Sequence, residues 1–119
     1  MRLDENLRNR TKAFASAIVR AYIALPKRRE EVAVLRKQML KAGTSVASHA
    51  REASRARSDA EFCSKLDGLL QEADETQLWI ELLVEDCQIH DPNLPIMHRE
   101  GGELIAIFTT MVSKVRRNL

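Results

Sequence analysis

Turn-forming and aromatic residues are scarce in this chain of 119 residues, which has four glycines, three prolines and 4% aromatic residues. Such a composition excludes collagen-like and mucin-like chains, and the 45% hydrophobic content excludes a fully disordered one. Alanine, leucine, arginine, glutamate and lysine are abundant instead, and these residues favour helix over sheet. The composition therefore predicts an all-α protein.

Cysteines are few and long apolar runs are absent. The only cysteines, Cys63 and Cys87, form no CxxC pair, which argues against a disulfide scaffold or zinc knuckle and predicts reduced thiols. The first residues do not resemble a signal peptide, and no run of about 18 apolar residues occurs. We therefore expect a cytoplasmic protein without a membrane partner. Its short length leaves little room for a deep cavity, so we expect no cofactor and no small-molecule substrate.

Four stretches carry apolar residues at three- and four-residue steps, the spacing of one helical face. The spacing predicts helices over 3–24, from Pro26 to about residue 56, from residue 59 to before Asp91, and around residues 97–115. Short connections join them, so the chain is predicted to be a single domain, residues 1–119, folded as an up-down-up-down four-helix bundle. Ser58 and Glu61 have the spacing of a capping box that opens the third helix.

Glycines interrupt two of these predicted helices. Gly43, followed by Thr44 and Ser45, predicts a close helix–helix approach or a slight bend within the second helix. Gly101 and Gly102 weaken the first turns of the fourth.

Charge is unevenly distributed along the chain. Residues 1–58 contain fourteen Lys and Arg against five Asp and Glu, a charge of +9, whereas residues 59–119 contain five against twelve, a charge of −7. Such asymmetry indicates charged partners or contact between copies. Three doublets at i and i+4 each share a helix face, and a basic cluster occupies the first connection. These candidate nucleic-acid contacts are Arg8, Lys12, Lys27, Arg28, Arg29, Lys37, Lys41, Arg51 and Arg55. A solvated bundle exterior is the simpler interpretation of the same residues.

Catalytic motifs are not found. The chain has no phosphate-cradling glycine loop and no common hydrolase motif, so no catalytic residue is predicted and we do not expect an enzyme. Glu72 and Glu75 form an E-x-x-E pair without a matching histidine, which makes a metal site a weak alternative. As a buried acid pair they would need partners, for which Arg51, Arg55 and Thr44 are candidates.

Three segments of the predicted helices resemble a known family. They are the G-T-S-V run within 43–53 that leads to E-A, the D-A-E-F of 59–62, and the block Q-E-A-D-E-T-Q-L-W-I-E-L-L of 71–83. Together they are similar to the bacterial four-helix-bundle family of 23S ribosomal RNA intervening-sequence proteins. The resemblance implies a cytoplasmic homopentamer with no established catalytic activity. It also implies that the matching positions serve helix packing and subunit contact: Gly43, Thr44, Ser45, Glu52, Glu72, Glu75, Thr76 and Trp79.

Two main hypotheses follow. In the first, a non-enzymatic homo-oligomer binds RNA or DNA through its basic first two helices. In the second, the chain is a protein-interaction scaffold without direct nucleic-acid contact, of the type that serves reverse transcriptases as an accessory subunit. A metal-dependent enzyme that uses Glu72 and Glu75 is a third hypothesis.

Overall fold

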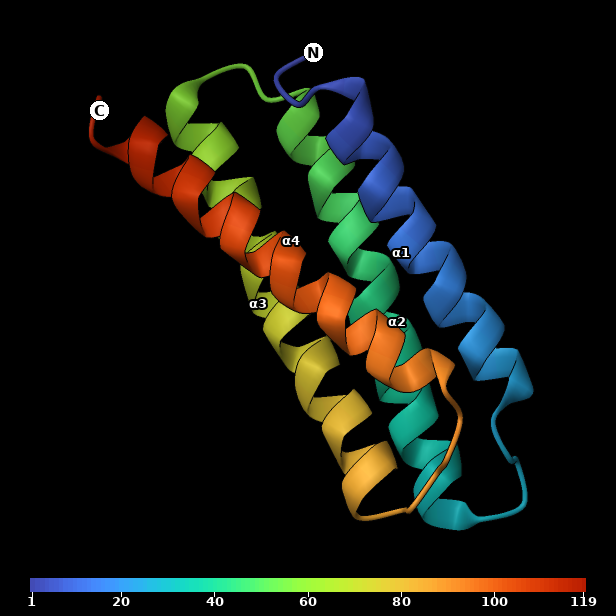
Figure 1. The fold of residues 1–119 in the computed structure, drawn as a ribbon. Helices are drawn as coiled ribbons and strands as arrows, with labels where there is room; N and C mark the ends of the chain where they lie inside the picture. The colour runs from blue at the N-terminus through green and yellow to red at the C-terminus, as the bar shows by residue number, and fades with distance from the viewer.

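Four helices make up the computed structural model, which describes all 119 residues (Figure 1). They are α1 (Glu5–Ala24), α2 (Glu30–Ser54), α3 (Asp59–Glu85) and α4 (Asn93–Arg116). Consecutive helices pack side by side and run antiparallel, and α1 also meets α4 over a shorter stretch. The apolar periodicity correctly predicts this up-down-up-down bundle, which measures 48 × 21 × 20 Å. None of its helices is both long enough and apolar enough to cross a bilayer.

Side-chain caps begin two of the helices. The Asp4 carboxylate accepts a hydrogen bond of 2.8 Å from the Leu7 amide, so α1 begins after Leu3 rather than at it. The Ser58 hydroxyl accepts one of 3.1 Å from the Glu61 amide and opens α3. Only this half of the predicted capping box forms, and the Glu61 carboxylate lies 3.8 Å from Arg57 Nε.

Helix α4 begins at Asn93, one turn before the predicted start near residue 97, and it continues through Gly101 and Gly102 without interruption. Pro95 is tolerated because amides in a first turn have no partner within the helix. At the opposite end of the bundle (Figure 1), both termini lie beside the connection between α2 and α3.

The core is one cluster of 24 buried apolar residues drawn from all four helices. Ile18, Met39, Leu66 and Phe108 are fully buried within it. Leu35, Met111 and Val115, which the periodicity also places inward, lie half-buried at its margin. Cys63 and Cys87 are buried free thiols. The burial therefore follows the predicted helical faces, and only their edges differ.

Two glycines mark where helices come closest. At Gly43 of α2, an added Cβ would lie 2.7 Å from Ile18 Cγ1 of α1, so the close approach predicted there does occur. At Gly101 of α4, a Cβ would lie 2.5 Å from the amide oxygen of Gln77. The Gln77 side chain is buried and donates from Nε2 to the His98 carbonyl at 2.8 Å, which ties α3 to α4.

A charged contact closes the bundle between α1 and α4. Arg10 donates from Nη2 and Nε to the two Glu100 oxygens, at 2.6 and 3.1 Å, and lies 3.3 Å from Glu103. Hydrogen bonding from Arg10 lowers the pKa of Glu100, so this carboxylate is ionised at neutral pH.

One buried cation has no acidic partner. Arg36 of α2 is 7% exposed, and its guanidinium lies 4.1 Å from the centre of the Tyr22 ring. It donates from Nη1 to the Tyr22 carbonyl at 3.2 Å, near the C-terminal end of α1, where cations are favoured. Arg36 is therefore a structural residue of the α1–α2 pair.

Candidate nucleic-acid interface

A groove between α1 and α2 brings together four of the predicted basic residues. Arg8 and Lys12 come from the first half of α1, and Arg51 and Arg55 from the end of α2 and just beyond it. Because the two helices are antiparallel, doublets far apart in the sequence lie level with each other. The groove has a volume of about 430 Å³ and is lined by Met1, Arg8, Asn9, Thr11, Lys12, Ala47, Arg51, Ser54 and Arg55.

The segment before α1 holds this end of the bundle together. The Arg2 amide donates to the Ser54 carbonyl at 2.9 Å, and Arg2 Nε donates to the Ala56 carbonyl at 2.9 Å. Arg2 Nη1 also pairs with Asp59 at 2.7 Å. These contacts, one between backbone groups and two from the Arg2 side chain, join the start of the chain to the end of α2 and the beginning of α3.

The cations of the groove are not neutralised within the chain. No acidic residue lines it. Arg8 donates from Nη1 to the Leu3 carbonyl at 2.9 Å, which leaves its other N–H groups free. Lys12, Arg51 and Arg55 make no side-chain hydrogen bond or ion pair, and all three are exposed. The groove therefore offers several free donors and concentrated positive charge to an anion.

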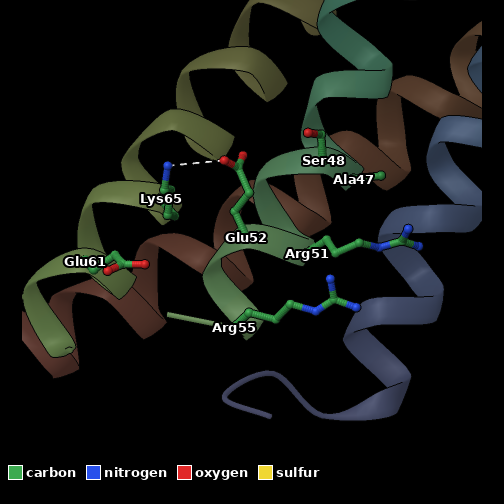
Figure 2. Close-up of a pocket in the computed structure, with 7 residues that line it drawn as sticks. All are labelled: Ala47, Ser48, Arg51, Glu52, Arg55, Glu61 and Lys65. Carbon is green, nitrogen blue, oxygen red and sulfur yellow. Dashed lines mark hydrogen bonds and ion pairs between the residues drawn. The ribbon is translucent and has the colours of Figure 1, made fainter. Parts of the chain in front are cut away.

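The acids nearest to this groove lie on the other side of α2. Figure 2 shows Arg51 and Arg55 reaching toward α1, whereas Glu52 extends toward Lys65 of α3. Lys65 Nζ donates to Glu52 at 3.2 Å, and this hydrogen bond lowers the pKa of the Glu52 carboxyl. A second hollow of about 600 Å³ lies on this side, where Arg51 and Arg55 form part of the lining together with Glu52, Glu61 and Lys65. Arg51 and Arg55 thus border both hollows, and only the groove on the α1 side has no acid in its lining.

The remaining predicted cations lie elsewhere. Lys27 and Arg28 are exposed in the connection at the opposite end of the bundle. Arg29 is occupied, because its Nε pairs with Glu31 at 2.7 Å and its Nη1 donates to the Cys87 carbonyl at 3.0 Å. Lys37 and Lys41 are exposed in the first half of α2. The nine candidates thus do not form one compact site.

The predicted partners of the acid pair are wrong. Glu72 and Glu75 are half-buried and make no ion pair. Arg51 and Arg55 line the groove beside α1, and the Thr44 hydroxyl donates to the Leu40 carbonyl at 2.7 Å. The reason is register: Lys65 pairs with Glu52, so Glu72 lies about two turns further along α3 than the arginines do.

The other positions implied by the resemblance are buried or half-buried on α2 and α3. Thr76 is buried and donates to the Glu72 carbonyl at 2.7 Å, and Trp79 is half-buried against the core. Ser45 donates to the Lys41 carbonyl at 2.7 Å. No three His, Cys, Asp or Glu side chains are grouped so that they could hold a metal ion, so the E-x-x-E pair gains no further ligand.

The uncharged polar residues that line the groove were not predicted from the sequence. Asn9, Thr11 and Ser54 line it, yet no spacing rule singles them out. Each lies within three residues of a predicted cation, so the helical neighbourhood of Arg8, Lys12, Arg51 and Arg55 is the signal that could have found them.

Comparisons with known proteins agree with this fold. A crystal structure of a protein of unknown function, from the S23 ribosomal protein family of Bacteroides thetaiotaomicron VPI-5482, is 31% identical in sequence. The match covers 89% of this chain and 97% of that one, with a TM-score of 0.80. No curated protein matches the chain. The family model described as 23S rRNA-intervening sequence protein matches residues 4–109, and the chain therefore belongs to this family.

Proposed function

We propose that this protein is a non-enzymatic bundle that binds the phosphate backbone of RNA or DNA in the groove between α1 and α2. The observation that supports it is the convergence of Arg8, Lys12, Arg51 and Arg55 on one groove whose lining contains no acid. Phosphate contact requires clustered, exposed cations, and arginine adds a planar set of donors that suits phosphate oxygens.

The salt dependence of binding tests this function. Each neutralised phosphate releases counterions, so log affinity should fall linearly with log salt, with a slope of about −0.9 per contact on a duplex. Four groove contacts predict a slope of about −3.6. The measurement is fluorescence anisotropy of a labelled oligonucleotide against the full chain in a salt series. No binding at low salt, or a flat dependence on salt, would contradict the proposal.

Self-association, with the homopentamer that the family resemblance implies, is our second proposal. Its support is apolar surface: Ile23 of α1 is 62% exposed and Ile96 of α4 is 59% exposed. Ile96 borders a groove of about 420 Å³ between the two helices that is lined mostly by apolar residues. Burying such surface favours association.

The mass in solution tests the second proposal. Light scattering should give a multiple of the 13.5 kDa chain mass, five-fold for a pentamer. If the opposite charges of the two halves hold the copies together, as in the scaffold hypothesis, high salt should lower that mass. A mass of one chain at low and high salt would exclude assembly by either route.

A further inference from the structure

Basic charge on α2 extends well beyond the groove. Lys37 and Lys41 precede Arg51 and Arg55 by 14 residues each, nearly four helical turns, so the two doublets point within about 40° of each other. Thr44 and Ser48 lie between them at the same three- and four-residue steps, and none of the six positions is acidic. We call this set the α2 stripe: Lys37, Lys41, Thr44, Ser48, Arg51 and Arg55. It is about 27 Å long.

Acidic residues are missing from almost the whole α1–α2 hairpin. None occurs between Glu5 and Glu30, and none between Glu31 and Glu52. From Lys37 to Ser48 the α2 stripe therefore has no carboxylate beside it on α1 or α2. At its far end Arg51 and Arg55 also border the hollow that contains Glu61 and Glu52, and Glu52 is paired with Lys65. A straight, rigid line of positive charge fits a ligand whose phosphates are also held in a rigid line.

Aromatic platforms for unpaired bases are absent from this face. Phe14, Phe62 and Phe108 are buried in the core, and Trp79 lies half-buried on α3. Tyr22, the remaining aromatic residue, is half-buried and is covered by the Arg36 guanidinium. Proteins that hold single strands gain binding energy when the bases stack on aromatic side chains. The α1–α2 hairpin has no exposed aromatic ring to supply that energy. A duplex does not need it, because its bases are already stacked on one another.

The shape of the hairpin restricts how a duplex could bind. Two packed helices, each about 10 Å across, form a face about 20 Å wide, and the major groove of B-DNA is about 12 Å wide. The two helices together therefore cannot enter the groove, so a duplex that contacts the α1–α2 face as a whole meets it through its phosphates.

We infer that the ligand of the α1–α2 face is a double-stranded nucleic acid, bound along its backbone without base readout. The groove holds one end of the contact and the α2 stripe extends it past Lys41. This inference rests on the proposed function, and it adds that paired strands are preferred over unpaired ones. A duplex also has the higher charge density, which increases the counterion release per contact from about 0.7 to about 0.9.

The experiment compares 20-residue single strands with the corresponding 20-base-pair duplexes, of two unrelated sequences, as DNA and as RNA. The full chain should bind each duplex at least 10-fold more tightly than its single strands. Affinities for the two duplex sequences should agree within a factor of about three. Tighter binding to single strands, or a strong preference for one duplex sequence, would overturn the inference and leave the groove function standing. Failure to bind any of the probes would instead overturn the proposed function.

Variants locate the contact. The double substitution Lys37→Gln and Lys41→Gln removes both cations of the α2 stripe that lie outside the groove. It should reduce the salt slope for a duplex by about 2 and weaken binding at low salt by at least 10-fold. Arg99→Gln with Lys114→Gln is the matched control, because it removes two exposed and unpaired cations from α4. Equal losses from the two pairs would show a general charge effect and overturn the assignment to α2.

Discussion

Replacing Arg51 and Arg55 together by glutamine is expected to weaken nucleic-acid binding about 100-fold at roughly 50 mM salt. The two guanidinium groups are exposed, free of ion pairs, and placed on the wall of an acid-free groove. Losing two phosphate contacts should also make the slope of log affinity against log salt shallower by about 2. Anisotropy titrations of wild type and variant over the same salt series measure both effects.

The change should leave the fold intact, because neither side chain donates a hydrogen bond within the chain and neither is buried. Helical circular dichroism and the urea midpoint should match those of the wild type. Arg51→Lys with Arg55→Lys retains the charge and should recover most of the affinity, except the part that depends on the planar guanidinium. The Arg99→Gln and Lys114→Gln pair should bind as the wild type does. If the glutamine variant retains full affinity with an unchanged slope, the groove is not the phosphate site.

The sequence predicts which cations share a helix face, but not that the faces of α1 and α2 meet to form the groove. Spacing alone places Arg8 with Lys12, and Arg51 with Arg55, each on one helix face. That the two faces meet depends on the register between α1 and α2, which is set by contacts such as Ile18 against Gly43. Register depends on how side chains of the two helices pack. The apolar periodicity of each helix therefore could not predict that Arg8 and Lys12 lie beside Arg51 and Arg55.

The same limitation accounts for the wrong expectations. The sequence shows a basic cluster at Lys27, Arg28 and Arg29. In the structure, however, the Arg29 side chain pairs with Glu31 and donates a hydrogen bond to the Cys87 carbonyl, so it is not free to bind a ligand. Arg51 and Arg55 are candidate partners for Glu72 in the sequence, yet the antiparallel register places them at a different level of the bundle. The helices themselves were predictable, because an apolar face every 3.6 residues and two side-chain caps are local properties. The burial of Arg36 could not be predicted from the sequence, because its partners are the Tyr22 ring and the Tyr22 carbonyl rather than an acid.

The register can itself be tested at Gly43. Gly43→Ala should lower the free energy of unfolding by about 2 kcal/mol, although alanine favours helix over glycine by about 1 kcal/mol. The added Cβ would lie 2.7 Å from Ile18 Cγ1 and 2.8 Å from Cγ2, and these atoms belong to a fully buried side chain that cannot move into solvent. Helices α1 and α2 would have to separate locally. Urea unfolding followed by circular dichroism measures the change.

Gly102→Ala is the matched control, since it makes the same substitution within a helix. Its Cβ would meet only Gln77 Nε2, at 3.8 Å, so this variant should gain about 1 kcal/mol from helix propensity alone. The two substitutions are thus expected to have opposite signs. In an Ile18→Ala background the clash at position 43 disappears, and Gly43→Ala should then become stabilising as well. A stabilising Gly43→Ala in the wild-type background would mean that α1 and α2 do not meet in this register, and the meeting of Arg8 and Lys12 with Arg51 and Arg55 would lose its structural basis.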